Sequence, residues 1–489
     1  MTQQVRTRFA PSPTGEPHIG NVRSALFAWL FARHNNGSFI LRIEDTDANR
    51  KVEGSEEKIK DGLRWLGLNW DEGPDIGGAY GPYTQSLRID RYKKAAQQLI
   101  DKGAAYKCYC SSERLEALRA SQVQNKLSIG YDRCCRNLTP AEREQKEKDG
   151  ITPVVRLKTA TEGQTVIHDM IWGDVTFKNN IIEDIVLLKS DGFPTYHLAH
   201  IVDDHDMAIS HVIRAEEWMS STPCHIMLFE AMGYEVPQYA HLPMVLGPDR
   251  SKLSKRHGAT STLEFRENGY LVEALVNFLA LVGWSLDDKT EIMSREELIK
   301  NFSLERVSKT AAIFNHEKLL WMNGVYIRGL SVDDLMGMVL PFMEKYLPPE
   351  VKRPLDIEYI RKIVPLIRER ISTLKDAATY ADFFFLDELK YDAAMFTDKK
   401  MTAEVALTAL KAAEEKLSSL ESFSPELLEV TLRHLAEELG IKAGQLFNPL
   451  RVATTARDAA PPLFETMAVL GKERCLKRIR AALVKLGGN

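Results

Sequence analysis

The order of apolar segments in the amino-terminal part of the chain constrains its fold most strongly. Residues 5–9 and 39–43 have the composition of short strands, and residues 21–34 between them space apolar side chains as a helix does. Another helical pattern follows at 55–66. Strands joined by a helical crossover run parallel. The sequence therefore predicts an α/β Rossmann-like domain built on a parallel sheet.

The pattern changes twice after this first region. An α+β insertion is indicated by helices and strands expected at 111–122, 140–148, 153–158 and 181–189. The sheet then resumes with two strand-like runs and a helix, expected at 194–202, 211–214 and 221–232. The end of the chain is helical, with helices expected at 402–420, from Ser424-Pro425, and at 472–486. The predicted segments are 1–107, 108–189, 190–250, 251–324 and 325–489.

Composition excludes several classes of protein. The chain has 489 residues, 44% hydrophobic and 27% charged, with a net charge of −4, which argues against disorder and against a uniformly basic nucleic-acid binder. The first residues lack the apolar core of a signal peptide. The most apolar long stretch, 271–284, contains Glu273 and Asn277 and is too short to span a bilayer. We expect a cytoplasmic protein.

The loop after the first strand is suited to a nucleotide. It reads PSPTGEPHIGN at 11–21, directly before a helix, and neither GxxxxGK[ST] nor GxGxxG is present. Three prolines set its path, and a helix amino terminus attracts phosphate. His18 can donate a hydrogen bond to a phosphate oxygen, and Gly20 leaves room for a flat base. The alternative is a rigid turn in which His18 merely caps the helix.

A second cationic segment lies at 252–256, where the sequence is KLSKR. Its functional interpretation is a mobile clamp, in which Lys252 and Lys255 stabilise the negative charge that develops on departing pyrophosphate. A solvated charged turn is the alternative.

These two segments together carry a family resemblance. A proline-rich loop with HIG, paired with KLSKR, resembles the class I aminoacyl-tRNA synthetases. The segments RFAPSPTG before HIG, LRIEDTD at 41–47, PTYHLAHIVDDH at 194–205 and HVIRAEEW at 211–218 resemble the glutamyl-tRNA synthetase family in particular, in its order and over essentially the whole chain. The chain departs from the pattern at Asn21, the fourth position of HIGH, and at His200. It also has Leu253 and Arg256 where the class pattern has methionine and serine.

The resemblance implies an activity and partners. It implies ATP-dependent attachment of glutamate to tRNA(Glu) through a glutamyl-adenylate, with Mg²⁺ on the ATP, by a monomer. Segment 108–189 would approach the tRNA acceptor end, 251–324 its stem, and 325–489 the anticodon, with Arg451, Arg478 and Arg480 as candidate phosphate contacts. Charging of tRNA(Gln) as well, and a catalytically silent tRNA-binding regulator, remain alternatives.

The resemblance also implies the site residues. Arginines bind carboxylates in a bidentate manner, and a carboxylate suits the ammonium group of glutamate. The implied glutamate-binding residues are Arg8, Ala10, Ser12, Glu44, Tyr196, His200 and Arg214. The implied ATP-binding residues are Pro11, Ser12, His18, Gly20, Asn21, Lys252, Ser254 and Lys255, of which His18, Lys252 and Lys255 are catalytic. A simple ion pair between Arg8 and Glu44, joining neighbouring strands, is the alternative for these two residues.

Four of the six cysteines lie between positions 108 and 135, which favours a metal site over a disulfide framework. Family members with a related pattern bind zinc, and the resemblance implies one structural zinc ion held by Cys108, Cys110, Tyr131 and Cys135. Cys134 is an alternative ligand, and unliganded thiols remain the other interpretation.

Overall fold

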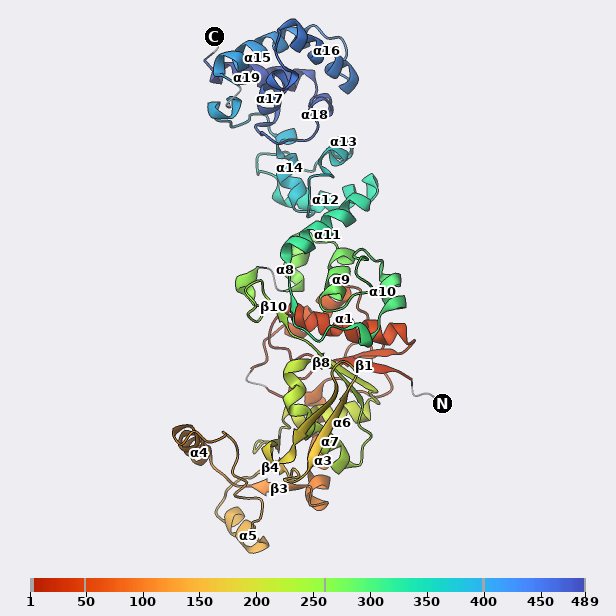
Figure 1. Ribbon diagram of the computed structural model, residues 1–489, viewed down its shortest axis with the longest axis vertical. Coiled ribbons are helices and arrows are strands. Elements are labelled where there is room, and N and C mark those ends of the chain that lie inside the picture. The colour runs from red at the N-terminus through yellow and green to blue at the C-terminus, as the bar shows by residue number, and fades with distance from the viewer. Residues whose placement is uncertain (1–3, 48–49, 259–260, 398–400, 488–489) are drawn as a thin grey trace. The chain divides into compact units, whose positions relative to one another are not determined.

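The computed structural model describes residues 4–47, 50–258, 261–397 and 401–487, apart from the side chain of Lys255. Contacts divide the chain into two units, which we describe separately. Unit 1 comprises Met1–Phe265 and Leu275–Asn315, and unit 2 comprises Arg266–Ala274 and His316–Asn489. In Figure 1 the colour runs from red to green through most of unit 1 and from green to blue through most of unit 2.

The predicted β-loop-α-β order is confirmed at the start of unit 1. Strand β1 (Arg6–Phe9) pairs in parallel with β2 (Ser38–Leu41), and α1 (Ile19–His34) connects them. Gly37 is required where the chain turns back towards β1, because a Cβ there would lie 2.2 Å from the carbonyl oxygen of Val5. The connection therefore places the carboxyl end of β1 beside that of β2.

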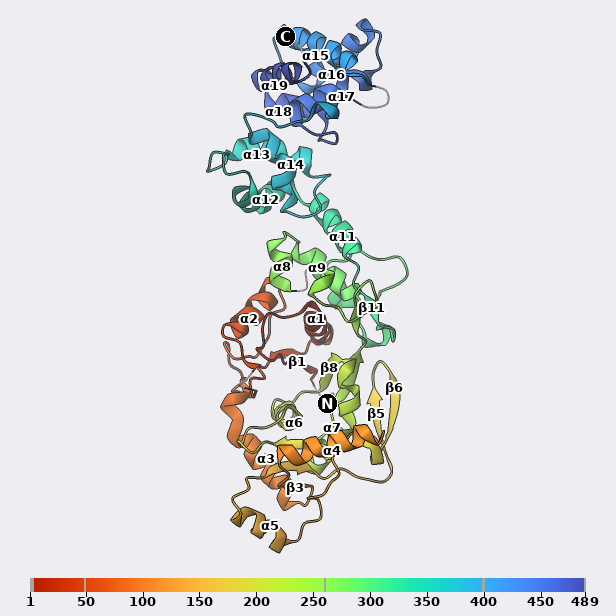
Figure 2. The same ribbon diagram turned by 90° about the vertical axis from the view of Figure 1, so that its left-hand side faces the viewer.

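A second sheet, of four strands, lies beside β1. The amide N–H of Ser210 donates to the carbonyl oxygen of Arg6 (3.0 Å), so that β8 (His211–Ala215) lies beside β1, as Figure 1 also shows. Next come β9 (Gln238–Leu242) and β5 (Gln164–Asp169), both parallel, and β6 (Gly173–Lys178), which is antiparallel to β5. The predicted insertion thus contributes the β5–β6 hairpin of Figure 2 to the sheet.

The remainder of the insertion forms a separate antiparallel sheet. Its strands β3 (Ala105–Cys108), β4 (Val154–Leu157) and β7 (Val186–Leu188) pair in the order β3-β4-β7. Helices α4 (Ser112–Gln124) and α5 (Pro140–Lys148) follow the prediction, and neither has a buried residue. The strand expected at 181–189 covers only β7, because residues 179–181 form a 3₁₀ turn, η3 (Asn179–Ile181).

The strand expected at 194–202 is wrong, because this segment is the helix α6 (Tyr196–Asp206). Leu198, Ile201 and Val202 are buried at helical spacing, and the extended Thr195 precedes the first turn. The helix packs with α3 (Ile89–Asp101) and α7 (Thr222–Met232), which have buried residues in the same core cluster. The predicted strand at 211–214 and helix at 221–232 are confirmed as β8 and α7.

The remaining elements of residues 1–315 are short. They are α2 (Ser55–Trp65), η2 (Gln85–Arg88), η4 (Glu216–Ser221), β10 (Val245–Leu246), η5 (Lys255–His257), α8 (Thr262–Glu267), α9 (Val272–Leu281), α10 (Arg295–Asn301), η6 (Leu304–Arg306) and β11 (Ala312–Ile313). Strand β10 pairs in parallel with β11, and Leu246 forms a bridge with Lys252. The loop that carries Lys252–Arg256 therefore starts from a fixed pair of strands.

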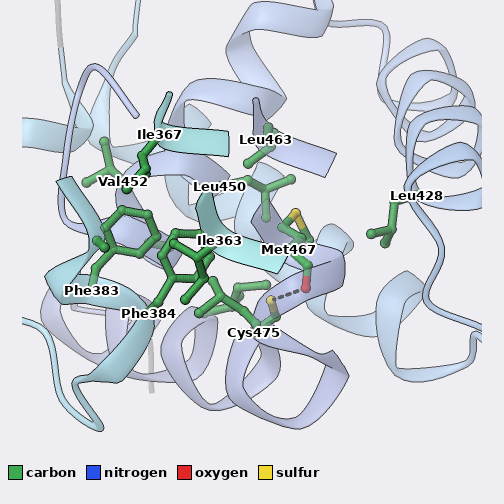
Figure 3. Packing of buried hydrophobic residues seen from close by; sticks show 14 of the residues in the cluster. Ile363, Ile367, Phe383, Phe384, Leu428, Leu450, Val452, Leu463, Met467 and Cys475 are labelled. Carbon is green, nitrogen blue, oxygen red and sulfur yellow. Dashed lines mark hydrogen bonds between the residues drawn. The ribbon is translucent and has the colours of Figure 1, made fainter. Parts of the chain in front are cut away.

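Unit 2 is helical, as the sequence predicts. Its helices beyond residue 315 are α11 (His316–Gly329), α12 (Val332–Tyr346), α13 (Ile357–Ile367), α14 (Asp376–Phe385), α15 (Ala403–Ser418), α16 (Pro425–Glu438), α17 (Ala443–Thr455), α18 (Leu463–Leu470) and α19 (Lys472–Lys485), with the 3₁₀ turn η7 (Ala393–Phe396). Ser424 caps α16, with proline in the first turn. Figure 3 shows the buried cluster, in which Phe384 of α14, Leu450 of α17 and Cys475 of α19 pack together.

Arg478 in α19 is buried in this unit and does not face solvent. Its Nη1 donates to the carbonyl oxygen of Thr454 at the end of α17 (2.5 Å), and its Nη2 donates to those of Phe383 and Leu386 at the end of α14 (2.6 Å each). The carbonyls at a helix end lack partners within the helix, and Arg478 satisfies three of them. The interpretation of Arg478 as a phosphate contact is therefore wrong.

We expect Arg478→Met to lower the free energy of unfolding of unit 2 by about 3 kcal/mol or more, because three buried carbonyl groups lose their donor. The matched control is Arg480→Met, since Arg480 in the same helix is 62% exposed and pairs with Glu414. The control should change the free energy by less than about 1 kcal/mol. Urea denaturation followed by circular dichroism measures both, and equal effects would refute this role of Arg478.

Candidate functional site

The proline-rich loop lies at the carboxyl end of β1 and ends at the amino terminus of α1. Nδ1 of His18, the N-cap residue, accepts a hydrogen bond from the N–H of Gly20 (3.2 Å). Its proton therefore resides on Nε2, which is buried and has no partner among the described residues. Burial and the nearby charge of Lys252 lower the pKa of His18, so the ring is neutral at pH 7. His18 caps the helix and still has an N–H to donate.

The rest of the loop is held by backbone hydrogen bonds. The N–H of Glu44 donates to the carbonyl oxygen of Pro11 (3.0 Å), and that of Val52 donates to Pro13 (2.9 Å). Ala10 follows β1 directly and is partly buried, as are Pro11 and Gly20, whereas Ser12 and Asn21 are exposed. The loop is thus fixed while Ser12 and Asn21 face outwards.

The KLSKR loop lies against this first segment. Ser261 forms an antiparallel bridge with His18. Nζ of Lys252 is exposed and pairs with Glu217 (3.0 Å), and the N–H of Ser254 donates to Nδ1 of His257 (3.0 Å). The side chain of Lys255 lies outside the described part of the chain. The two segments singled out from the sequence therefore come together in unit 1.

A buried charged network underlies the site. Asp204 of α6 accepts from Nε of Arg8 in β1 (3.1 Å) and from Nη1 of Arg42 (2.7 Å), whose Nη2 donates to Glu44 (3.0 Å). The alternative of an ion pair between Arg8 and Glu44 is therefore wrong. Burial raises the pKa of Glu44, whereas Arg8 and Arg42 outweigh burial at Asp204 and hold the pKa of that carboxyl well below its ordinary value.

Arg214 of β8 has a different environment. It is 6% exposed, and Nη1 donates to the Tyr196 hydroxyl (3.3 Å). Nη2 donates to Oγ1 of Thr222 (2.8 Å) and lies 3.3 Å from Nδ1 of His225, while Nε donates to Nε2 of His241 (3.1 Å). Burial lowers the pKa of both histidines, so they are neutral. No carboxylate of the described residues pairs with Arg214.

Aromatic rings cover Arg214. The Tyr196 ring stacks on His200 (4.4 Å between centroids, 12° between planes) and lies 4.3 Å from the Trp218 ring. His200 is buried, with Nδ1 2.9 Å from the carbonyl oxygen of Tyr196 and Nε2 without a partner among the described residues. Burial lowers the pKa of His200 well below its ordinary value. The neutral ring therefore backs Tyr196.

A cavity of about 430 Å³ has Tyr196 in its wall. It lies at the carboxyl end of the parallel strands, where such sheets bind ligands. Its lining includes Ser12, Glu44, Thr46, Lys189, Thr195 and Tyr196. A second cavity of about 290 Å³ has His211 and Gln238 in its lining and so lies at the opposite, amino end of β8 and β9. The first cavity combines a cation, an anion and an aromatic wall.

Several residues of the site were not found from the sequence. Thr222, His225 and His241 contact Arg214, and Asp204 pairs with Arg8. Only Asp204 lay within a segment that the sequence had singled out, at 194–205. The others lie on α7 and β9, whose side chains reach Arg214 only after the sheet has formed.

The cysteines of the insertion lie together. Sγ atoms of Cys108, Cys110 and Cys135 are all within 4.8 Å of one another. The Tyr131 hydroxyl is 3.2 Å from Sγ of Cys108 and 3.7 Å from that of Cys110. Sγ of Cys134 is 3.3 Å from that of Cys110, and all these thiols are free. The structure thus brings together both the set predicted from the sequence and its alternative ligand.

No helix in the described ranges is both long and apolar enough to cross a membrane.

Comparison with known proteins identifies the family. Residues 4–321 match the family model described as tRNA synthetases class I (E and Q), catalytic domain, and residues 334–483 match an anticodon binding domain. A glutamate–tRNA ligase of Dehalococcoides mccartyi is 56% identical over 486 residues, which cover 99% of this chain and 98% of that protein. A glutamate–tRNA ligase of Moorella thermoacetica is 48% identical over 481 residues, which cover 98% of each chain.

A solved structure agrees. The crystal structure of a glutamate tRNA ligase from Elizabethkingia meningosepticum, in complex with its amino acid, superposes with a TM-score of 0.89 at 37% identity, covering 99% of this chain and 100% of that one. The fold class predicted from the sequence, a parallel-sheet catalytic domain with an insertion and a helical carboxyl-terminal region, is therefore confirmed. The chain belongs to the glutamate–tRNA ligase family of class I aminoacyl-tRNA synthetases.

Proposed function

We propose that this protein attaches L-glutamate to tRNA(Glu) in two steps. The α-carboxylate of glutamate attacks the α-phosphorus of ATP, which forms glutamyl-adenylate and releases pyrophosphate. A terminal ribose hydroxyl of the tRNA then attacks the acyl carbon and releases AMP. The observation that carries this proposal is Arg214, a buried cation beside the cavity that no described carboxylate pairs with. Such a group is suited to binding a carboxylate of the substrate.

The two arginines would divide the recognition of glutamate. Arg214 would receive the side-chain carboxylate, because its protein partners are neutral. Arg8, already paired with Asp204, would contribute a hydrogen bond and positive potential near the reacting end, assisted by Ser12 and Ala10 of the loop. Glu44 would face the ammonium group of glutamate. Burial raises the pKa of Glu44, but the nearby positive charge of the ammonium group would favour the ionised carboxylate. Tyr196, backed by His200, would form the wall between them.

The loop at the start of α1 would hold ATP. The Nε2–H of His18 is a buried donor that no described residue accepts, at the positive end of a helix dipole. The nucleotide would be lined by Pro11, Ser12, Gly20, Asn21 and Ser254. Lys252 and Lys255 would stabilise the negative charge that develops on the departing pyrophosphate. Lys252 can exchange its exposed ion pair with Glu217 for a phosphate at little cost. Bound Mg²⁺ neutralises phosphate charge; the residues named here position the reacting groups.

The helical unit would read the anticodon. Its match to an anticodon binding domain supports this role. Arg480 is exposed, and partly buried Arg451 donates to the side-chain oxygen of Asn448 (3.1 Å). We propose that both approach phosphates of the tRNA. We also propose a cytoplasmic, monomeric protein, with the insertion 108–189 near the tRNA acceptor end and 251–324 near its stem.

Arg214→Gln should raise the KM for glutamate by roughly 100-fold or more and leave the KM for ATP nearly unchanged, because an ion pair to the substrate is lost. ATP–pyrophosphate exchange in the presence of tRNA(Glu) measures both. The control is Arg91→Gln, an exposed arginine paired with Asp206. A well-folded wild type without exchange, with or without tRNA, would instead favour a catalytically silent regulator.

Lys255→Ala should slow adenylate formation by roughly 10²-fold while the affinity for glutamate stays the same, since the charge acts on departing pyrophosphate. Single-turnover formation of adenylate gives the rate. Lys148→Ala, an exposed lysine in α5, serves as the control. An unchanged rate would remove Lys255 from the clamp.

We also propose one structural zinc ion held by Cys108, Cys110, Tyr131 and Cys135. The three Sγ atoms lie within 4.8 Å of one another, and the Tyr131 hydroxyl lies 3.2 and 3.7 Å from two of them. Together they form a donor set of the kind that zinc accepts. Cys134 is the alternative fourth ligand. The residues come from the end of β3 and from the 131–135 turn, so that the ion would fasten this turn to the small sheet.

Cys110→Ser should lower the zinc content clearly below that of the wild type, because Cys110 lies within 3.7 Å of the Tyr131 hydroxyl and of the Sγ atoms of Cys134 and Cys135. Elemental analysis of the purified proteins measures this. Cys224→Ser, at a buried cysteine elsewhere, should keep its zinc. A metal-free wild type, prepared without chelators, would contradict the proposal.

A further inference from the structure

A buried pair of side chains lies directly behind Arg214. Oδ2 of Asp169, at the end of β5, is 2.7 Å from Nδ1 of His241 in β9, and neither side chain is exposed. Oδ1 of Asp169 accepts from the N–H groups of Ile171 (2.9 Å) and Trp172 (3.0 Å), and Oδ2 also accepts from the N–H of His241 (3.1 Å). The carboxylate is thus held in one orientation by backbone donors.

This geometry fixes the tautomer of His241. An ionised carboxylate can only accept, so Nδ1 of His241 must carry the proton. Nε2 then presents a lone pair, and this is the atom that accepts the Nε–H of Arg214 (3.1 Å). Hydrogen bonds from His241 and the backbone outweigh burial and lower the pKa of Asp169, and burial lowers the pKa of His241. The pair is therefore a carboxylate and a neutral imidazole.

The other hydrogen bonds of Arg214 depend on this one. The Nε–H fixes the plane of the guanidinium group, and Nη2 lies between Thr222 and His225. Together with the bond from Nη1 to Tyr196, these contacts use four of the five N–H groups of an arginine. The remaining N–H belongs to Nη1, whose other N–H donates to Tyr196, and Tyr196 lines the cavity. The acceptor on His241 thus determines where Arg214 can meet a ligand.

We propose that Asp169 and His241 are positioning residues, which hold Arg214 in the orientation that receives the side-chain carboxylate of the substrate by keeping Nε2 of His241 unprotonated. Neither residue touches the substrate. The inference rests on the proposed role of Arg214 in binding glutamate. It assigns a function to a strand, β5, that belongs to the segment between the two halves of the sheet domain.

Asp169→Asn tests the tautomer. The asparagine keeps Oδ1 for the N–H groups of Ile171 and Trp172 but turns an amide N–H₂ towards Nδ1 of His241. The backbone N–H of His241, which Oδ2 accepts in the wild type (3.1 Å), also loses its acceptor. The proton of His241 then moves to Nε2, where it faces the Nε–H of Arg214, donor against donor. The acceptor within reach of this proton is Oγ1 of Thr222 (3.1 Å), which in the wild type accepts from Nη2 of Arg214. We expect the KM for glutamate to rise by roughly 10- to 100-fold, and the KM for ATP and kcat at saturating glutamate to change little.

Two substitutions of His241 form a matched pair. In His241→Gln the side-chain oxygen takes the place of Nε2, so that the acceptor for Arg214 remains while the donor to Asp169 is lost. In His241→Asn the side-chain nitrogen takes the place of Nδ1, so that the donor to Asp169 remains while the acceptor for Arg214 is lost. We expect His241→Asn to raise the KM for glutamate as Asp169→Asn does, and His241→Gln to stay within about threefold of the wild type.

The double variant separates positioning from general packing. An amide oxygen cannot change its tautomer, so Asp169→Asn should add little to the KM for glutamate once His241→Gln is present. An equal increase in both backgrounds would overturn the proposal, as would an unchanged KM in Asp169→Asn. If Arg214→Gln leaves the KM for glutamate unchanged, the proposed function of Arg214 fails, whatever these variants do.

A second measurement needs no activity. Spectra of protein labelled with ¹⁵N-histidine report which ring nitrogen carries the proton, and the signal missing in His241→Gln assigns His241. We expect Nδ1–H in the wild type and Nε2–H in Asp169→Asn. The same tautomer in both proteins would overturn the proposal even if the substitution weakened folding.

Discussion

The ion pairs of Asp204 with Arg8 and Arg42 are the interaction on which the rest of the site depends. Two guanidinium groups from neighbouring strands would repel each other at the buried carboxyl edge of the sheet, and Asp204 on α6 lies between them at 3.1 and 2.7 Å. Removing one partner of such a buried group costs about 3–5 kcal/mol, because the remaining charges are left without compensation. Asp204 therefore fixes α6 against β1 and β2. Tyr196 and His200 lie on that helix.

Arg214, in contrast, has no such compensation of its charge by a described carboxylate. Its hydrogen bonds go to a phenol, an alcohol and two neutral imidazoles, so its geometry is fixed while its charge is left uncompensated by any described carboxylate. A buried cation is costly, and neutral acceptors recover only part of the lost hydration. In the proposed function, the side-chain carboxylate of bound glutamate would remove this cost. Charge compensation thus distinguishes Arg8, which pairs with Asp204, from Arg214, for which we propose a carboxylate of the substrate as the partner.

The sequence predicted what depends on local patterns. The strand, loop and helix at 5–34 and the helix after Ser424-Pro425 follow from apolar spacing and capping, and the structure has them at these places. The strand expected at 194–202 failed because Leu198, Ile201 and Val202 suit a short strand as well as a helix, and packing against α3 and α7 decided between them.

The sequence does not show which polar side chains become buried by segments that are distant along the chain. Arg478 and Arg480 look alike in one amphipathic helix, yet the first is enclosed by the ends of two other helices and the second is exposed. His241 and Asp169 gave no signal, because each is a single polar residue in a strand that becomes a neighbour of Arg214 only through strand pairing. A short sequence motif can identify a loop that is suited to binding a ligand. The side chains that orient the binding residues come from separate segments of the chain, which no local motif connects.

The environment of Arg214 also bears on the choice between glutamate and glutamine. The two ligands have nearly the same shape, so packing against Tyr196 cannot separate them strongly. A carboxylate forms an ion pair with the buried guanidinium, whereas a carboxamide offers only a neutral oxygen and adds an N–H₂ group that needs an acceptor. Around Arg214 the lone pairs of His225 and His241 already accept from the arginine. If Arg214 receives the side chain of the substrate, as we propose, these two histidines offer no free lone pair to the amide nitrogen of glutamine, and both effects would favour glutamate.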